Sequence, residues 1–429
     1  MSHLELISRL AQPLADGEGK IVLLVLDGLG DIRTEAQPLT PLEHAALPHL
    51  DALARRSALG RLVPVAPGVT PGSGPGHLAL FGHDPTQPAA DIGRGVLEAL
   101  GEGLPVGPGD VAARGNFATA DAAGNLTDRR AGRIPTEECR RLCAAIREAL
   151  RPEQPVDGVQ VTVEAGEGHR FVLLLRGDGL SPDLEDTDPQ RLGVPPEPVT
   201  ARHNAREGGR VREGGEAREG GERAERTAAV VRRVVATIER ALAGEPRANR
   251  VLLRGFSQLP HLPRMSDLYH LRCGAFAGYP LYRGAAAACG MEVVPAGKRP
   301  AEAIAAAGAN WQRFDYFFVH VKQTDAAGED GDFAAKARAI EEVDASLPAL
   351  LELRPAVLAI TGDHSTPAPL KSHSWHPVPL LLCSGCCSID GSQEFSERAA
   401  AHGELGTILS HQLMGLLLAN AGRLAKYGA

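Results

Sequence analysis

Nearly apolar runs of five to seven residues recur along the chain, and several of them end abruptly in polar residues. The clearest runs are Lys20–Leu26, Phe314–His320 and Ala356–Ile360. A strand that is buried on both faces has this pattern, so we expect these runs to be strands of a parallel sheet covered by helices. Further strand candidates are Val251–Leu253, Met291–Pro295 and Pro379–Cys383.

Segments with a helical repeat lie between these runs. Pro41–Ser57 and Lys336–Leu353 each place leucine, isoleucine or valine side chains on one stripe. A helix of small residues is expected at Pro300–Ala307, and a closing helix at Leu405–Leu418. Strands that alternate with helices predict an α/β fold, with the sheet between helices.

Between about residues 88 and 249 the pattern changes, and arginines become frequent. Helix-like segments at Thr136–Leu150 and Arg226–Leu242 alternate there with strand-like segments at Val159–Glu164 and Phe171–Arg176. This alternation predicts a separate α/β module. Within it, Arg-Glu-Gly-Gly recurs every six residues. Such a charged, glycine-rich tract buries nothing, so we expect a flexible surface loop near 202–223.

The composition is that of a soluble globular protein. The chain has 429 residues, 43% of them hydrophobic, which suffices for one large or two ordinary domains. The formal net charge of −8 argues against a nucleic acid or an anionic membrane as partner. The N-terminus does not resemble a leader and no apolar stretch is long enough to span a bilayer, so we expect a cytoplasmic protein. The pattern carries no signal for an oligomeric state.

Seven scattered cysteines indicate reduced thiols better than a disulfide framework. Cys383, Cys386 and Cys387 resemble half of a zinc site, but no second CxxC pair completes it. We therefore expect these thiols to be structural.

Polar residues with metal-binding side chains follow the three clearest strands. Asp27 ends the first strand, Asp325 follows the second with Glu329 four residues later, and Asp363-His364 follow the third. His373 lies nine residues beyond His364, and Gly362 allows the backbone to bend so that Asp363 and His364 converge. Each residue alone has an ordinary structural explanation. Together they offer oxygen and nitrogen ligands for two divalent ions at one edge of the sheet.

Ser73 stands in the stretch Val69–Leu78, which is too rich in glycine and proline to be regular before about His77. We expect Ser73 on a tight loop that leads into a helix. It is either a turn or N-cap serine, or a nucleophile whose alkoxide is stabilised by a metal and by the helix N-terminus.

Arginines form a second group of candidates. Arg129, Arg130 and Arg133 lie in a short glycine-containing segment, and Arg170 follows Gly168-His169. Their guanidinium groups could converge on a carboxylate or a phosphate. The alternative is that they form ion pairs on the surface.

These motifs resemble those of one enzyme family. The motifs are Leu26-Asp27-Gly28, Ser73-x-x-Gly-His77, Thr324-Asp325, Asp363-His364, His373 before Pro377-Val-Pro, Asp128-Arg-Arg-Ala-Gly-Arg133, Gly168-His-Arg170, Asp186-Thr-Asp-Pro189 and Tyr282-Arg-Gly284. Over essentially the whole chain, the set is similar to the cofactor-independent phosphoglycerate mutases of archaeal type, in the alkaline phosphatase superfamily.

The resemblance implies an alkaline-phosphatase-like metal-binding domain at 1–88 and 250–429, with 89–249 inserted as a lid. It implies one metal among Asp27, Ser73, Asp363 and His364, with Ser73 as nucleophile. Asp325, His373 and residue 329 would hold the second metal. The implied reaction interconverts 3-phosphoglycerate and 2-phosphoglycerate through a phosphoserine, without 2,3-bisphosphoglycerate. The arginines at 129, 130, 133 and 170 would grip the carboxylate and phosphate of this small phosphorylated acid.

One position departs from the family pattern. Glu329 stands where the family has histidine. A carboxylate there favours manganese or magnesium over zinc, and the alternative is that the second metal is lost. Two further functions stay open: a related metal-dependent phosphatase or small-molecule kinase, and a binding protein that has lost catalysis. The chain has no glycine loop followed by lysine, which makes a P-loop mechanism unfavourable.

Overall fold

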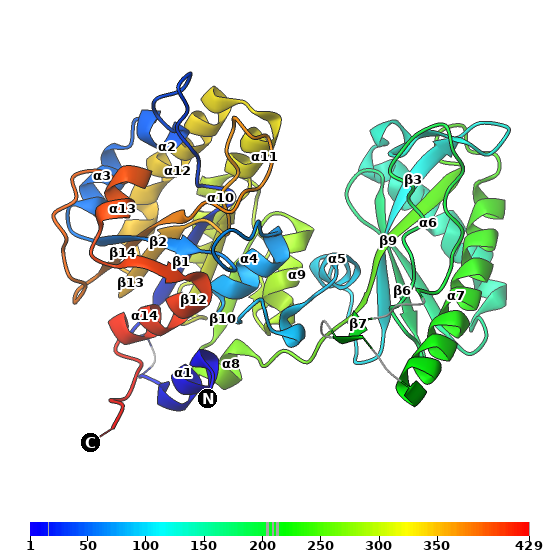
Figure 1. Cartoon of the computed structure of the whole chain (residues 1–429), viewed down its shortest axis with the longest axis horizontal. Coiled ribbons are helices and arrows are strands. Elements are labelled where there is room, and N and C mark those ends of the chain that lie inside the picture. The colour runs from blue at the N-terminus through cyan, green and yellow to red at the C-terminus, as the bar shows by residue number, and fades with distance from the viewer. Residues whose placement is uncertain (16, 203–205, 208–209, 212–213, 429) are drawn as a thin grey trace. The chain divides into compact units, whose positions relative to one another are not determined.

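The computed structural model describes residues 1–15, 17–202, 206–207, 210–211 and 214–428. The chain divides into two compact units (Figure 1). Unit 1 comprises residues 1–90 and 262–429, and unit 2 comprises residues 91–261.

Unit 1 is built on an eight-stranded mixed sheet that lies between two groups of helices (Figure 1). Across the sheet the strands are β11 (Glu292–Val293), β10 (Cys273–Phe276), β12 (Tyr316–Val321), β1 (Ile21–Leu26), β13 (Val357–Thr361), β14 (Val378–Ser384), β2 (Ala58–Val63) and β15 (Gly406–Leu409). The helices are α1 (His3–Leu10), α2 (Pro41–His44), α3 (Pro48–Ala54), α4 (Ser73–Leu80), α8 (Met265–Tyr269), α9 (Pro280–Ala288), α10 (Pro300–Ala309), α11 (Gln323–Asp330), α12 (Phe333–Glu352), α13 (Glu397–His402) and α14 (Leu413–Asn420). This arrangement confirms the predicted α/β class.

The centre of the sheet explains the apolar runs. All residues of β1, β12 and β13 are buried, and β1 pairs in parallel with both of the others. Because helices cover both faces, side chains on either side of these strands enter a core, and the alternation of a half-exposed strand is absent. The three strands therefore end at the same edge of the sheet.

Two predicted helices of unit 1 differ from the structure. The segment predicted as one helix holds two, α2 and α3: the backbone is already extended at Ala45, and Pro48, the first residue of α3, keeps the preceding Leu47 out of helical geometry. The closing helix begins only at Leu413, since residues 406–409 form β15, which pairs with the edge of β2.

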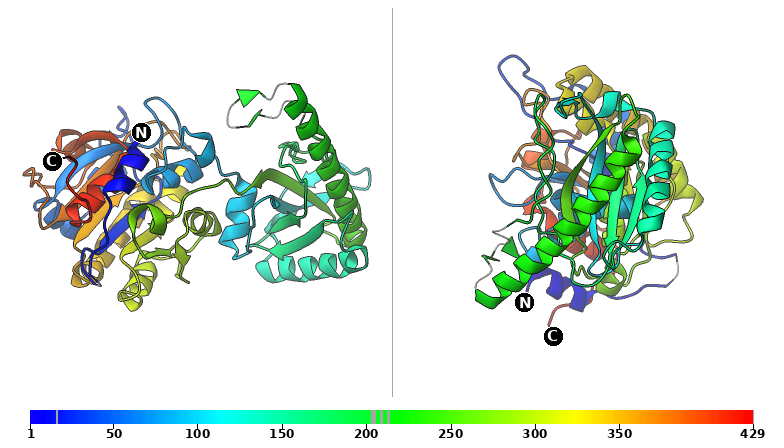
Figure 2. Two further views of the ribbon diagram at one scale, coloured as in Figure 1. Left: turned by 90° about the horizontal axis from the view of Figure 1, so that it is seen from below. Right: turned by 90° about the vertical axis from the view of Figure 1, so that its right-hand side faces the viewer.

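Unit 2 contains a five-stranded antiparallel sheet. In this sheet β3 (Val111–Ala120) pairs with β4 (Leu126–Asp128), β6 (Arg170–Arg176) and β9 (Arg250–Gln258), and β5 (Gln160–Ala165) pairs with β6. Helices α6 (Thr136–Leu150) and α7 (Gly214–Leu242) pack against each other and against this sheet (Figure 2), while α5 (Arg94–Gly101) packs on β3 and β9. The expected helix at 136–150 and both strand-like segments are present.

The run Val251–Leu253, which we placed with the larger sheet, belongs to unit 2. It lies in β9, and Val251 and Leu253 are buried in the core of unit 2, where they pack in one cluster with residues of α6 and α7. The second boundary between the units therefore falls at residue 261 rather than 249.

The expected flexible tract at 202–223 lies partly outside the described residues. Its described part contains the short strands β7 (Arg206–Glu207) and β8 (Arg210–Val211) and the first turns of α7. Residues 214–223 are therefore helical where we predicted a loop. The pair Arg223–Glu219, at helical i,i+4 spacing and 2.9 Å, stabilises this part of the helix.

Among the described helices, none has the length and apolarity that crossing a lipid bilayer requires. None of the seven cysteines forms a disulfide, and four of them are buried.

Candidate active site

The carboxyl ends of β12, β1 and β13 place four buried side chains close together. Asp27 directly follows β1, and Asp363 and His364 follow β13. Asp325 lies in the first turn of α11, just after β12. The side chains of all four residues are fully buried, as expected for strands that end at one edge.

Asp27, Asp363 and His364 form a first cluster that fits a divalent cation. Nε2 of His364 lies 3.3 Å from Oδ1 of Asp27 and 3.2 Å from Oδ2 of Asp363. In the described structure, no well-aligned hydrogen bond reaches either side-chain oxygen of Asp27 or Oδ2 of Asp363, although His320, Lys322 and His77 lie 3.1–3.4 Å away as charge partners. Buried carboxylate oxygens without well-aligned hydrogen bonds are unfavourable, and a bound cation would satisfy them.

Asp325, His364 and His373 form a second cluster. Nε2 of His373 lies 3.6 Å from Oδ1 of Asp325, and the rings of His364 and His373 stack at 3.7 Å. Nδ1 of His373 lies 3.0 Å from the carbonyl of Pro71, to which it donates, so Nε2 keeps its lone pair for a cation. Neither cluster contains a cysteine.

His364 belongs to both clusters, and Thr366 shows which ring nitrogen serves as ligand. The Thr366 hydroxyl lies 2.5 Å from Oδ1 of Asp325 and donates its hydrogen there. It therefore accepts from Nδ1 of His364, at 3.0 Å. The lone pair of His364 is then on Nε2, which faces Asp27 and Asp363, so His364 serves the first cluster.

Glu329 lies at the edge of the second cluster. Its Oε1 is 3.8 Å from Nε2 of His373, the nitrogen that Asp325 also approaches, as the four-residue spacing predicts. The Glu329 side chain is 54% exposed, and neither cluster includes it. Its role as a metal ligand stays a prediction.

Ser73 faces the first cluster. It is the first residue of α4, so the helix begins four residues earlier than expected, and its Oγ lies 3.3 Å from Nε2 of His364. A side-chain oxygen at a helix N-terminus lies near unpaired backbone N–H groups, which favour negative charge. This position therefore favours the ionised form of the Ser73 hydroxyl.

Three side chains near the clusters were not assigned a role from the sequence. Nδ1 of His77 lies 3.1 Å from Oδ2 of Asp363 and 2.8 Å from the carbonyl of Ser73. Nε2 of His320 and Nζ of Lys322 lie 3.3 and 3.4 Å from Oδ2 of Asp27, and Lys322 also pairs with Asp325. The i,i+2 spacing of His320 and Lys322 at a strand end was the available signal, since such residues share a face.

Neighbouring charges set the protonation of the first cluster. Burial opposes ionisation of Asp27, but Lys322 and His320 outweigh it and hold the pKa of Asp27 well below its usual range. The pKa of Asp363 is also lowered, because His364 and His77 outweigh burial and the charge of Asp27. Burial lowers the pKa of His364 although both carboxylates oppose it. Ionised carboxylates and a neutral imidazole are the forms that bind a cation.

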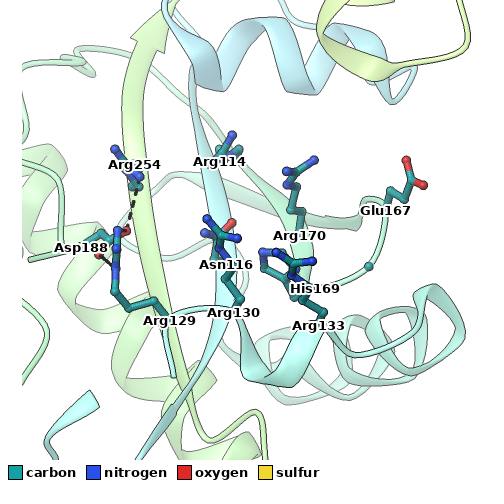
Figure 3. A pocket seen from close by; sticks show the side chains of 11 residues that line it. Arg114, Asn116, Arg129, Arg130, Arg133, Glu167, His169, Arg170, Asp188 and Arg254 are labelled. Carbon is teal, nitrogen blue, oxygen red and sulfur yellow. Dashed lines mark hydrogen bonds and ion pairs between the residues drawn. The ribbon is translucent and has the colours of Figure 1, made fainter. Parts of the chain in front are cut away.

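Unit 2 holds a separate pocket of about 390 Å³ that is rich in arginine (Figure 3). All four arginines selected from the sequence line it. The full lining is Arg114, Asn116, Arg129, Arg130, Arg133, Glu167, Gly168, His169, Arg170, Asp188 and Arg254. Arg114 and Arg254 were missed, although they face each other across the β3–β9 pair. Their strands pair only through the fold, so the spacing in sequence gave no signal.

The arginines of the pocket are not equivalent. Arg129 makes a two-pronged ion pair with Asp188, at 2.7 Å for each hydrogen bond. In the described part of the chain, the side chains of Arg130, Arg133 and Arg170 form no ion pair. Burial and the nearby Arg170 and Arg130 lower the pKa of His169 to about 4, so its ring is neutral at pH 7. The pocket therefore carries an excess of positive charge and suits an anion.

Comparisons with known proteins agree with the motifs. A family model described as 2,3-bisphosphoglycerate-independent phosphoglycerate mutase matches residues 54–248. A probable enzyme of this description from Thermus thermophilus is 48% identical over 413 residues, which are 96% of each chain. Another from Thermotoga maritima is 46% identical over 425 residues, 99% of each chain.

Solved structures show the same fold. A cofactor-independent phosphoglycerate mutase from Thermoplasma acidophilum superposes with a TM-score of 0.67 at 29% identity, covering 94% of this chain and 100% of that one. A protein from Pyrococcus horikoshii superposes with a TM-score of 0.77 at 28% identity, covering 96% of this chain and 100% of the other.

Proposed function

The chain belongs to the 2,3-bisphosphoglycerate-independent phosphoglycerate mutases, and from this premise we propose that it works through a phosphoserine on Ser73 at a two-metal site. Ser73 takes the phosphoryl group from one hydroxyl oxygen of the glycerate, and the other hydroxyl takes it back. The observation that carries the proposal is the 3.3 Å between Oγ of Ser73 and Nε2 of His364, beside the buried carboxylates of Asp27 and Asp363.

Two cations would complete this site. Asp27, Asp363 and His364 would hold one, and Asp325 and His373 the other, with Glu329 within reach of the second. When bound, such ions withdraw charge from phosphoryl oxygens and favour ionisation of a serine hydroxyl. The carboxylate-rich ligand set favours manganese or magnesium over zinc.

Residues of the chain itself supply the remaining functions. The N-terminus of α4 favours negative charge on Oγ of Ser73. The Lys322 ammonium lies beside Asp27 and Asp325, where it is available to a phosphoryl oxygen. His77 contacts both Asp363 and the backbone of Ser73, so it holds the nucleophile and a metal ligand in one arrangement.

Unit 2 supplies recognition of the anionic substrate in this proposal. Its pocket presents guanidinium groups, which match carboxylate and phosphate geometry. The role of unit 2 as a lid stays a prediction. It has a chemical reason, because a phosphoserine that meets water is hydrolysed instead of returned to the glycerate.

Phosphorus NMR on purified protein tests the proposal in one measurement. With 3-phosphoglycerate, divalent metal and no 2,3-bisphosphoglycerate, we expect the 2-phosphoglycerate signal to appear. We expect no signal with Ser73→Ala and normal turnover with Ser346→Ala, whose exposed hydroxyl bonds only within α12. Steady growth of orthophosphate instead would indicate a phosphatase, and binding without turnover would indicate a protein that has lost catalysis.

A further inference from the structure

A buried lysine joins two loops that follow neighbouring strands of the large sheet. Lys336 lies on α12, and its side chain is 0% exposed. An ammonium group has three hydrogens to donate. Those of Lys336 meet the carbonyl of Gly30 at 3.1 Å, Oδ2 of Asp31 at 2.9 Å and the carbonyl of Thr366 at 2.8 Å. Gly30 and Asp31 belong to the loop after β1, and Thr366 belongs to the loop after β13, so one side chain holds both loops.

Asp31 ties the same two loops together from the other side of the ion pair. Its side chain is 1% exposed, and Oδ2 accepts a second hydrogen bond, from the backbone N–H of Ala368 at 3.0 Å. Oδ1 accepts from the N–H of Ile32 at 2.8 Å, within its own loop. The backbone N–H of Thr366 donates to the carbonyl of Gly30 at 3.1 Å. The ion pair therefore lies at the point where the loops cross.

Thr366 connects this crossing to both metal clusters. Its carbonyl accepts from Lys336, while its hydroxyl donates to Asp325 and accepts from Nδ1 of His364. A shift of the Thr366 backbone would move this hydroxyl and the two side chains that it orients. The other loop held by Lys336 begins at Asp27. In the described part of the chain no hydrogen bond or ion pair joins Lys336 itself to a cluster residue, so any influence on the clusters passes through these loops.

The energetics of the buried pair favour a positioning role over a stabilising one. Moving an ammonium and a carboxylate out of water is costly, and an apolar pair of similar size often gives equal or greater stability. Charged hydrogen bonds, unlike apolar contacts, fix the distance and direction of their partners. Side chains that bind a metal have to be held within about 0.5 Å of their working geometry. An ion pair at the crossing of two ligand-bearing loops meets this requirement.

We propose that Lys336 is a positioning residue for the two-metal site, where it holds the loops after β1 and β13 in fixed register. Asp31 keeps the ammonium in place between them. The inference deepens the proposed function and rests on it for the role of the cations. It assigns the geometry of the first cluster to a residue that lies outside both clusters.

Lys336→Met tests the proposal, because methionine fills similar space without donating a hydrogen bond. The measurement is calorimetric titration of the full-length protein with manganese chloride, after removal of bound metal with a chelator. We expect the Kd for manganese to rise about tenfold or more. On the manganese-loaded variant we expect kcat to fall about 10- to 100-fold. KM for 3-phosphoglycerate should change less than about twofold, since the arginine pocket of unit 2 is unaltered.

Lys336→Met/Asp31→Asn is the second variant. The single change leaves the buried Asp31 carboxylate without its cation, which lowers stability. The double change removes that charge as well, so we expect stability to recover in part while manganese affinity and kcat stay low. If charge balance were the whole role of Lys336, the double variant would regain manganese affinity together with stability. That result would overturn the inference.

Lys20→Met is the matched control. Lys20 is 5% exposed, and Nζ donates to the carbonyls of Trp311 and Phe314 at the opposite edge of the same sheet. We expect this variant to be destabilised but to keep wild-type manganese affinity and kcat. Wild-type manganese affinity in both Lys336 variants, or an equal loss in Lys20→Met, would also overturn the inference. Failure of the proposed function would show separately, as a wild-type protein that binds manganese but forms no 2-phosphoglycerate.

Discussion

At the scale of single residues, the site is marked by a concentration of buried charge. Asp27 and Asp363 are fully buried, and in the described structure no well-aligned hydrogen bond reaches three of their four side-chain oxygens. Sequence analysis found both residues because each directly follows an apolar run. It assigned no role to His77 or His320, since the sequence shows that a histidine is present but not which carboxylate it faces.

We expect binding of the second metal to depend more on Asp325 than on Glu329. Asp325 is buried within the second cluster, while Glu329 is exposed at its edge. We expect the wild-type protein to hold about two ions per chain and Asp325→Ala about one, with kcat/KM lower by about a thousandfold. For Glu329→Ala, which removes an exposed ligand at the edge of the cluster, we expect the second ion to be held more weakly but not lost. Elemental analysis of purified protein measures this, and a wild-type count near one ion would contradict the two-metal proposal.

His83 links stability to pH outside the site. Its side chain is 3% exposed, Nε2 has no hydrogen-bond partner among the described residues, and burial lowers its pKa to about 4. The folded state therefore favours the neutral ring. As pH falls below the unfolded pKa of about 6.5, the ring is protonated more readily in the unfolded chain, so the free energy of unfolding decreases. Between pH 7 and pH 5 we expect the wild type to lose about 2 kcal/mol more unfolding free energy than His83→Leu. Urea titrations at both pH values measure the difference, and equal losses would refute it.

At the scale of elements, glycines let the segments that carry the site approach one another. A Cβ on Gly76 of α4 would lie 2.6 Å from the carbonyl of Asp363, and one on Gly328 of α11 would lie 2.3 Å from that of Thr366. Both helices therefore rest directly on the backbone that follows β13. Ser73 and Asp325 take their positions from this close contact.

Gly76→Ala should displace Ser73 without removing any reactive group. The added methyl meets backbone, so α4 has to shift, and a displacement near 1 Å lowers turnover by about a hundredfold. Gly72→Ala is the control, because its Cβ would meet only Pro75, at 3.8 Å. Steady-state kinetics on both variants compares them. Equal activity of the two variants would show that α4 does not set the position of the nucleophile.

Sequence patterns identified the central elements better than those at the periphery. β1, β12 and β13 could be predicted because all their residues are buried, which leaves a continuous apolar run. β2 was missed because Gly60 and Arg61 interrupt its pattern, and β15 was missed because its four residues become a strand only by pairing with β2. β9 was placed in the wrong sheet, since an apolar run does not specify its partner strand.

At the scale of the whole molecule, positive charge is concentrated against an overall negative balance. The chain has a formal net charge of −8, yet six arginines line one pocket of unit 2. In the proposed function, attraction of the anionic substrate by this pocket competes with the general repulsion of the negatively charged protein. Asp27, Asp325, Asp363 and His364 are buried, so their charges are less affected by dissolved ions.

This contrast predicts how salt affects catalysis. Between about 20 mM and about 200 mM potassium chloride, we expect KM for 3-phosphoglycerate to rise about three- to tenfold, because salt screens the exposed arginines. We expect kcat to change less than about twofold. Arg170→Gln should flatten the dependence of KM on salt. A fall in kcat at constant KM would instead place the sensitive charges at the metal site.

The order of strands in unit 1 has a consequence for synthesis on the ribosome. β1 emerges early, but its partners β12 and β13 are translated only after the whole of unit 2. At about 5–20 residues per second, its six apolar residues wait about 15–60 s for them. We expect a nascent chain stalled just after residue 290 to show a protease-resistant 91–261 fragment and a readily cleaved N-terminal segment. A resistant N-terminal segment at that stage would mean that β1 is shielded before its partners exist.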